Sequence, residues 1–396
     1  MARAPRASAE GRLVTAPLLL AIFSTFGGML SLGVLLPVLP RFAEGPLDAG
    51  GVGIGLSVGA SSITAVVAQP FVGRLGDAYG RRLLVVGAPL LLALVGLAYV
   101  PAESLAAVIA LRLVAGVGEG ALLVGGATVV TDLAPAERRG QAVSYFTLAP
   151  YGGVALGPLL GELVLGGERY DAVWTCSAAL AAAAALLGTL VPETRPERSG
   201  APARRGLVHG AALAPGIVLA CALLGFGGFN AFVALYALEL GLDGGGLVFL
   251  EFAGIVVAVR LFGARIPDLL GAQRCATLAL VLLATAFAAI ALWDQPAGLF
   301  VGTAVMALGQ SLAYPALVTL AVGRAPAEER GAVIGTFSAF VDLAIFGGAA
   351  GLGAVVSAAG YQEAFLTASV AAALGLPLLA GIARPRPVPV AADDLA

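Results

Sequence analysis

The chain has 396 residues, of which 59% are hydrophobic and 12% are charged, and its mean hydropathy is +0.97. A soluble domain carries about 25% charged residues, so most of this surface cannot face water. The net charge is −2, and all 22 basic residues are arginine, which excludes a phosphate-binding loop or a Schiff-base site built on lysine. The single histidine, His209, cannot form a two-histidine zinc motif, so we expect no metal and no cofactor.

Long apolar runs follow one another along the whole chain. A helix needs roughly 20 such residues to cross a bilayer, and it satisfies its own backbone hydrogen bonds there. The strands of a membrane barrel would instead alternate apolar and polar residues. The sequence therefore predicts an all-α membrane protein with twelve transmembrane helices, at residues 14–38, 50–72, 83–100, 105–130, 141–165, 171–190, 211–238, 244–262, 275–292, 298–322, 331–357 and 364–383.

A polar segment rich in arginine and proline separates the sixth run from the seventh. The predicted parts are an N-terminal six-helix bundle, a cytoplasmic linker, and a C-terminal six-helix bundle with a short cytoplasmic tail, at residues 1–192, 193–210 and 211–396. With the N-terminus inside, the outer loops hold only Arg41 and Arg169, and Arg112 lies deep within a run, so the remaining 19 of the 22 arginines fall on the cytoplasmic side or at its boundary. The positive-inside rule thus predicts a multi-pass plasma-membrane protein with both termini in the cytoplasm.

The two halves repeat with a constant offset of 191 residues. This offset places Asp77 on Asp268, Gly80 on Gly271, Gly118 on Gly309 and Gly157 on Gly348. Because the offset spans six helices, both copies have the same orientation in the membrane. The result is a parallel repeat about an axis along the membrane normal, as in transporters that rock about a central site.

The connection after the second run reads GRLGDAYGRR, from Gly73 to Arg82. It resembles the G-x-x-x-D-x-x-G-R-[RK] loop of the major facilitator superfamily, and a degenerate copy follows the eighth run. The matching positions are Gly73, Asp77, Gly80, Arg81 and Arg82, and in the copy Asp268 and Gly271. The resemblance implies a major facilitator fold, with two six-helix bundles around a central cavity, and a loop that acts as a conformational latch.

The residues of this loop support two interpretations. Glycine permits a tight turn between two helices, and the Asp77 carboxylate would be stabilised beside a neighbouring helix N-terminus. The alternative is a basic loop that only fixes topology, which explains the arginines but not the aspartate.

The fifth run contains glycines at every fourth position and a proline: Gly153, Gly157, Pro158 and Gly161. This pattern resembles the antiporter signature of the twelve-span drug:proton antiporters, with Ser144 and Glu162 in place of two of the family's glycines. The resemblance implies an exporter. The alternative is ordinary close packing of small residues between helices, which needs no antiport.

Charged residues inside the runs are costly unless they are paired or hydrated, and they often mark transport pathways. Arg112 and Glu119 lie seven residues apart on the fourth run, hence on the same helix face. The candidates for transport and coupling are Arg112, Glu119, Asp342 and Glu251, and the uncharged polar candidates for the cavity are Asn230, Gln310 and Tyr314. The alternative is that Arg112 and Glu119 form a purely structural ion pair.

These features predict a secondary transporter that works by alternating access, most simply a proton-coupled efflux antiporter for a small, largely apolar compound. The expected partners are that substrate, protons and the lipid bilayer, with no nucleic acid, and the monomer is the expected functional unit. Such an exporter would contribute to multidrug resistance. The alternatives are a proton-coupled importer or exporter of sugars or other metabolites and, from other classes, a membrane-embedded enzyme or a non-transporting receptor.

Overall fold

The computed structural model describes residues 14–135, 138–194, 209–263, 269–326 and 329–383. The helices of the first half are α1 (Ala16–Leu35), α2 (Val38–Glu44), α3 (Gly51–Tyr79), α4 (Arg82–Ala98), α5 (Leu105–Leu133), α6 (Arg139–Leu165) and α7 (Tyr170–Thr189). Those of the second half are α8 (Gly210–Glu239), α9 (Gly246–Phe262), α11 (Ala272–Leu292), α12 (Pro296–Val322), α13 (Arg330–Ala359) and α14 (Tyr361–Ala383).

The helices confirm the predicted membrane architecture. Within the described ranges, ten helical segments are long and apolar enough to cross a membrane, with α1 and α2 counted together as one segment. The helices α4 and α9 have 17 residues each, near the lower limit of about 17 for a span. With these two included, helix occupies every predicted run.

The predicted ends differ from the observed ones at two places. The helix predicted to end at residue 72 continues as α3 to Tyr79, so most of the motif that begins at Gly73 is helical rather than a loop. The first predicted span breaks at Pro37, which has no backbone N–H to continue the hydrogen-bond ladder, and α2 follows as a short separate helix.

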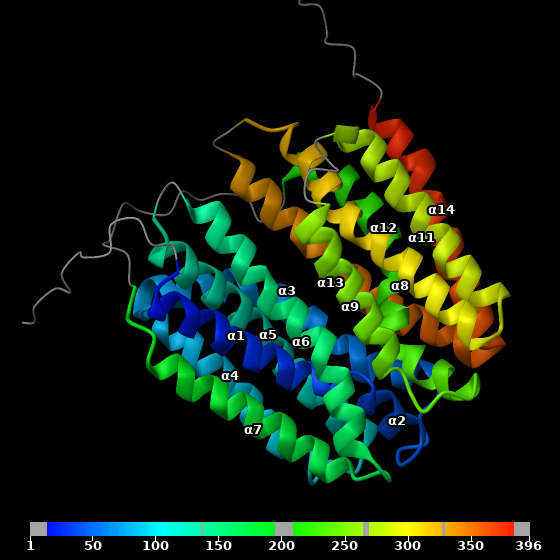
Figure 1. Ribbon diagram of the computed structural model, residues 1–396, viewed down its shortest axis with the longest axis horizontal. Coiled ribbons are helices and arrows are strands. Elements are labelled where there is room, and N and C mark those ends of the chain that lie inside the picture. Colours follow the sequence, from blue (N-terminus) through cyan, green and yellow to red (C-terminus); the bar gives the residue numbers. More distant parts are fainter. Residues whose placement is uncertain (1–13, 136–137, 195–208, 264–268, 327–328, 384–396) are drawn as a thin grey trace, which may run out of the picture.

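The helices form two bundles, α1–α7 and α8–α14, which lie side by side in Figure 1. Between the bundles α3 packs against α13, and α6 packs against α9. The end where α3, α5 and α12 finish is called here the arginine-rich end, because its helix ends and connections carry Arg81, Arg82, Arg138, Arg139, Arg324 and Arg330. The end where α3 and α5 begin is called the opposite end.

The packing of each bundle confirms the repeat predicted from the offset of 191 residues. A Cβ atom added to Gly118 of α5 would lie 2.9 Å from Leu92 and 3.4 Å from the Ala88 carbonyl, both of α4. A Cβ on Gly309 of α12 would lie 2.9 Å from Leu283 and 3.0 Å from the Ala279 carbonyl, both of α11. The residue numbers of the second contact equal those of the first plus 191. The same close contact between two helices therefore occurs in both bundles.

The glycines of the fifth predicted run form a contact surface on α6. A Cβ atom on Gly157 would lie 2.5 Å from the Cα of Gly33 in α1, and one on Gly153 would lie 2.6 Å from the Met29 backbone. Any side chain there would force the two backbones apart. The repeat carries the equivalent contact, since Gly348 of α13 lies against Leu224 of α8. The glycines therefore hold α6 to α1 inside one bundle.

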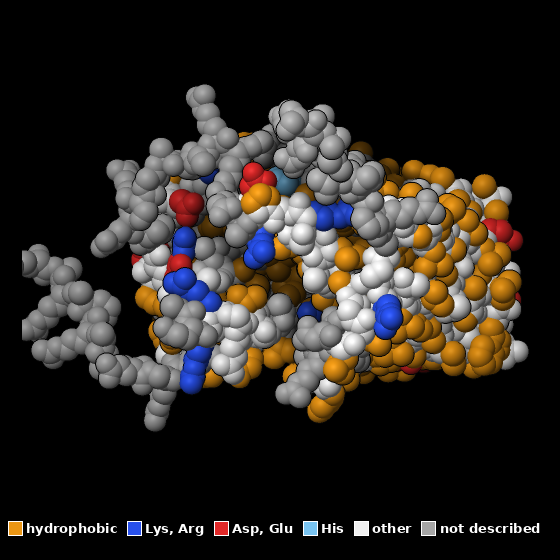
Figure 2. All heavy atoms as spheres, turned by 90° about the horizontal axis from the view of Figure 1, so that it is seen from above, with side chains coloured by type: hydrophobic (Ala, Val, Ile, Leu, Met, Phe, Trp, Pro, Cys, Tyr) orange, Lys and Arg blue, Asp and Glu red, His pale blue; other side chains and the backbone are white. Residues whose placement is uncertain are grey.

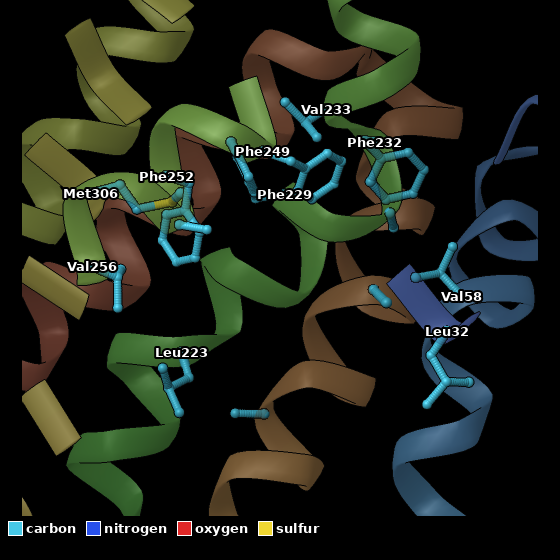
Figure 3. Packing of buried hydrophobic residues seen from close by; sticks show 14 of the residues in the cluster. Leu32, Val58, Leu223, Phe229, Phe232, Val233, Phe249, Phe252, Val256 and Met306 are labelled. Carbon is cyan, nitrogen blue, oxygen red and sulfur yellow. The ribbon is translucent and has the colours of Figure 1, made fainter. Parts of the chain in front are cut away.

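Aromatic side chains fill the core of the second bundle, as Figure 3 shows for α8 and α9. Phe229 of α8 packs edge-on against Phe249 of α9, with ring centroids 5.7 Å apart, and Phe252 completes the group. Met306 of α12 is fully buried beside them. This aromatic core packs around α8, which carries one polar residue of the site described below.

Polar contacts and close backbone packing join the two bundles at the opposite end. Gly51 of α3 lies directly against the backbone of Gly353 in α13. Arg41, in α2, donates from Nη2 to the Asp243 carbonyl across the interface at 2.7 Å. The Glu162 carboxylate of α6 lies against Gly244 and Gly246, at the start of α9. These contacts close the opposite end.

Candidate functional site

A cavity of about 160 Å³ lies between the two bundles. Helices α1, α3, α5 and α6 line it from the first bundle, and α8 and α13 line it from the second. Its polar side chains are Ser61, Ser62, Arg112, Glu119, Asn230 and Asp342, and the remaining lining is apolar apart from one glycine. Figure 2 shows the molecule hollowed between the bundles, with hydrophobic side chains inside and arginine side chains beside the opening.

The sequence therefore identified four side chains that the structure brings to one cavity: Arg112 and Glu119 of α5, Asn230 of α8 and Asp342 of α13. Arg112 is 5% exposed. Its Nη2 atom donates to the Val58 carbonyl at 2.8 Å and to the Ser61 hydroxyl at 2.7 Å, both in α3. A buried guanidinium requires such acceptors, because its desolvation is otherwise uncompensated.

Glu119 lies two helical turns from Arg112 and faces the same cavity. No ion pair within 4 Å joins these two described side chains, so the direct structural pair that formed our alternative interpretation is not made in this conformation. The Ser61 hydroxyl accepts from Arg112 and lines the same cavity as both side chains. The charge of Arg112 therefore acts on Glu119 through space.

Asp342 brings a second carboxylate to the cavity, from the other bundle. It is partly buried, and its Oδ2 atom accepts from Nε2 of Gln69 in α3 at 3.4 Å. Because Glu119 belongs to the first bundle and Asp342 to the second, the two acidic groups change their separation whenever the bundles move.

Asn230 is the most buried uncharged candidate, at 8% exposed. Its Oδ1 atom is buried and has no hydrogen-bond partner among the described residues. A buried amide oxygen without a partner costs about 1–3 kcal/mol, so such atoms in native proteins call for an explanation.

The other three candidates are not among the residues that line this cavity. Glu251 of α9 and Gln310 of α12 each have a buried side-chain oxygen without a hydrogen-bond partner in the described part of the chain. The Tyr314 hydroxyl of α12 lies 3.2 Å from the Ser338 hydroxyl of α13. They belong to the packing around α12 and α9 in this conformation.

The sequence motif at the end of α3 forms a cluster of ion pairs and hydrogen bonds at the arginine-rich end. Arg81 pairs with Asp132 in the last turn of α5 and, at 3.4 Å, with Asp77. The Arg81 backbone N–H donates to Oε1 of Glu193 at 2.7 Å, and Arg82 donates to the Thr189 carbonyl at the end of α7. The motif thus ties α3 to α5 and α7.

The helix-dipole contact that we expect for Asp77 is not observed in this conformation. Its side chain is 64% exposed, and its recorded ion pair is with Arg81, four residues away, which supplies a nearer opposite charge. Gly80 has φ +106° and Gly271 has φ +77°, so both copies of the motif place glycine where other residues are strained. Asp268 of the second copy, with most of the predicted linker, lies outside the described residues.

Sequence reasoning missed Ser61, Asp132 and Glu193 as partners of the predicted residues. Asp132 could have been found as an acidic residue in the last turn of a span, at the same end as a basic loop. Glu193 stands in the short Pro-Glu-Thr segment that follows the sixth span. Ser61 gives no such signal, because a serine in an apolar run is common.

Comparison with known proteins decides the family. The profile of the Major Facilitator Superfamily matches residues 21–349 and 252–395. The chain belongs to this superfamily. A relative described as an uncharacterized MFS-type transporter of Salmonella typhimurium is 33% identical over 366 residues, covering 88% of this chain and 92% of the relative. Another, from Pseudomonas aeruginosa, is 30% identical, with 94% of each chain covered.

Solved structures confirm the major facilitator fold. A bacterial homolog of the human lysosomal transporter Spinster, in an inward-facing state, superimposes with a TM-score of 0.79 at 12% identity over 96% of this chain and all of that chain. The xylose transporter XylE of E. coli, in a partially occluded inward-open state, has a TM-score of 0.75 at 12% identity and covers 94% of this chain and all of its own. This major facilitator protein is therefore a multi-pass membrane transporter and not an enzyme.

Proposed function

We propose that this transporter exports a small, largely apolar compound in exchange for protons, by alternating access. The observation that carries the proposal is a cavity between the bundles in which apolar walls surround two carboxyl groups from opposite bundles, Glu119 and Asp342. A carboxyl group that lines a membrane cavity can take up a proton from one side and release it to the other.

Each charged residue of the cavity has a role in this proposal. Glu119 and Asp342 carry the coupling protons. Arg112, held by the carbonyl of Val58 and the hydroxyl of Ser61, provides the positive charge that keeps Glu119 stable when no proton is bound. Glu251 is the third candidate, and its position away from the cavity lining makes it the weaker one.

The orientation proposed from the arginine distribution gives the cavity a direction. If the arginine-rich end faces the cytoplasm, the hollow in Figure 2 opens to the cytoplasm and the contact between Gly51 and Gly353 closes the outside. An exporter must bind its substrate in this state. This proposal also includes a location in the plasma membrane, cytoplasmic termini, the latch role of Asp77 and function as a monomer.

The glycines of α6 contribute to the proposal in a limited way. Their contact with α1 lies inside one bundle, which agrees with close packing of small residues and needs no antiport. The likeness to the twelve-span drug:proton antiporters, and a role in multidrug resistance, therefore depend on the cavity rather than on these glycines. The alternative within the same class is a proton-coupled importer of sugars or other metabolites.

Everted membrane vesicles test the direction of coupling. Respiration acidifies their interior, which quenches a trapped acridine dye. Addition of a transported compound to the outside should restore fluorescence, because each molecule that enters expels protons. A symporter that imports its substrate in the cell would produce no such recovery, and this result would replace our proposal with the importer. Vesicles carrying the double variant Glu119→Gln, Asp342→Asn provide the control.

A further inference from the structure

A further cavity, of about 330 Å³, lies between α6 of the first bundle and α9 and α12 of the second. None of the residues that line it also lines the central cavity. Ser144 lies five residues after the start of α6 and Arg260 two residues before the end of α9, so the cavity is at the arginine-rich end. At 1.5 Å per residue, these positions are near the boundary between the acyl chains and the lipid headgroups.

Arg260 is the only charged side chain that lines this cavity in the described part of the chain. Its Nη2 atom donates to the Tyr151 hydroxyl of α6, and its guanidinium carbon lies 4.3 Å from the centre of that ring. Its Nε atom is buried without a hydrogen-bond partner, and it makes no ion pair within 4 Å with a described carboxylate. A cation this close to the membrane interior is costly unless an anion accompanies it.

Tyr145 of α6 brings a second donor to the same cavity. Its hydroxyl oxygen accepts from Nε2 of Gln141 at 3.1 Å, and its own O–H has no recorded acceptor among the described residues. The three serine and threonine hydroxyls of the lining donate instead to carbonyls of their own helices. The cavity therefore has free donors from both bundles and no acidic group in its lining, an arrangement that binds an anion.

One side of this cavity opens toward lipid. Leu261 of α9 lines the cavity and is 61% exposed. Leu247, fourteen residues earlier and so on the same face of α9, is also 61% exposed, and it lies at the closed end of the molecule. A face that is exposed along the whole of a membrane helix contacts acyl chains, because the hollow between the bundles reaches only one end. Leu148 of α6, also exposed, completes the apolar rim.

We propose that this cavity binds an anionic phospholipid from the leaflet at the arginine-rich end. Arg260 and the O–H of Tyr145 donate to the phosphate oxygens, and the acyl chains lie against Leu148 and Leu261. A guanidinium matches a phosphate because it can donate two parallel N–H bonds to it. A free phosphate ion would leave the apolar rim uncovered, and a zwitterionic headgroup would bring its own cation next to Arg260. The lipid is not the transported compound, so this site goes beyond the proposed function.

The bound lipid connects the two bundles. Arg260 belongs to the second bundle and Tyr145 to the first, so one phosphate that accepts from both holds α6 and α9 at their present separation. Movement of the bundles at the arginine-rich end would take one donor away from the phosphate. The lipid therefore stabilises the conformation in which both donors face one cavity.

Native mass spectrometry of the purified full-length transporter tests the proposal, because it counts the lipids that each molecule retains. The probes are dioleoylphosphatidylglycerol and dioleoylphosphatidylcholine, which have the same acyl chains. Affinity for the first phosphatidylglycerol should fall about tenfold in Arg260→Gln, since a hydrogen-bonded charge is lost. Arg274→Gln removes an exposed arginine at the same end and should leave it unchanged. Equal affinities in these two variants would overturn the proposal, because the basic end alone would then attract the lipid.

Tyr145→Phe tests the contribution of the first bundle. It keeps the ring and removes the donor, so it should weaken phosphatidylglycerol binding by roughly fivefold. An affinity equal to that of the unaltered protein would show that the lipid does not connect the bundles. This variant also keeps the proposal testable if Arg260→Gln does not fold.

The thermal unfolding midpoint supplies a second readout and separates a lipid from a free anion. Phosphatidylglycerol should raise the midpoint of the unaltered protein and of Arg274→Gln more than phosphatidylcholine does, and it should not do so for Arg260→Gln. Inorganic phosphate at the same concentration should neither raise the midpoint nor displace the lipid. If phosphate displaces the lipid, the site binds a free anion and the lipid proposal is wrong. A similar midpoint of all variants in phosphatidylcholine shows that they are folded.

Discussion

The Glu162 carboxylate of α6 lies against the backbone of Gly246, the residue at which α9 begins in the other bundle. Negative charge is stabilised at a helix N-terminus by the exposed N–H groups and by the helix dipole. The contact crosses the bundle interface at the opposite end, next to the hydrogen bond from Arg41 to Asp243. Glu162 stands at a position where the antiporter signature has glycine.

Removal of this carboxylate should open the closed end. With Glu162→Ala, a cysteine introduced at Leu36, in the cavity wall, should react more often with an impermeant thiol reagent added from the opposite end. Loss of a stabilising interaction of about 1 kcal/mol should raise the population that is open at this end, and therefore reactive, by roughly fivefold. The protein used for labelling should have its native cysteines, Cys176, Cys221 and Cys275, replaced. An unchanged labelling rate would show that the glycine contact of α3 and α13 closes this end unaided.

The motif at the end of α3 should be required for transport rather than only for insertion. Asp77→Asn keeps the size of the side chain and removes its charge, so it should insert normally and lose most of its transport. The ion pair of Arg81 with Asp132 remains in this variant, which limits any loss of stability. Flux equal to that of the unaltered protein would reduce the motif to a topological signal. Vesicle flux normalised to the amount of inserted protein is the measurement.

The two cavity acids should be required for coupling. Glu119→Gln and Asp342→Asn should each uncouple transport from the pH gradient, because neither amide can carry a proton. Arg112→Ala should damage both coupling and folding, since it leaves the acceptors of α3 unpaired and Glu119 without a compensating charge. If both acid variants retain transport driven by the pH gradient, neither acid is the coupling group. Initial rates with and without the gradient provide the comparison.

The close contact of α6 with α1 offers a stability test with an internal control. Gly157→Ala should lower the free energy of unfolding by about 1–3 kcal/mol, because its Cβ would meet the Gly33 backbone. Gly347→Ala adds the same atom in open space on α13, and alanine favours helix over glycine by about 1 kcal/mol. It should therefore be neutral or stabilising. Equal effects of the two variants in thermal unfolding would contradict the packing described for α6.

Cysteine labelling should establish the membrane orientation. Cysteines at Ser199 and Ala391 should resist an impermeant reagent in intact cells, whereas one at Glu103, in the exposed connection of α4 and α5, should react. Labelling of either of the first two from outside would invert the proposed topology, and with it the direction of export.

The sequence was sufficient for the spans and for the repeat, because both depend on composition and on constant spacing. It also named four cavity residues, since a charge or amide in an apolar run is rarely placed towards lipid. The neighbours of these residues could not be predicted. Lipid is as apolar as the bundle interior, so hydrophobic periodicity does not tell which face of α5 meets α3. The pairing of Arg112 with Ser61 depends on that rotation.

The same limit applies to the motif at the end of α3. Its spacing identified Asp77 and Arg81, which pair with each other, but the second partner of Arg81, Asp132, lies more than fifty residues away, at the end of α5. Glu251, Gln310 and Tyr314 were selected by polarity alone, and polarity does not separate a cavity wall from a packed helix interface. Three-dimensional packing made that distinction.

The contact of Gly51 with Gly353 also has a mechanical consequence. It lies at one extremity of α3, a helix of 29 residues that extends about 43 Å at 1.5 Å per residue. The close contact continues to Gly55 and Gly59 of α3, which lie against Ala349 of α13. Beyond Gly59, α3 extends about 30 Å further, to Tyr79 at the arginine-rich end. A tilt of a few degrees about the glycine contact therefore displaces that end by roughly 2 Å, so that a small change at the closed end alters the opening at the other.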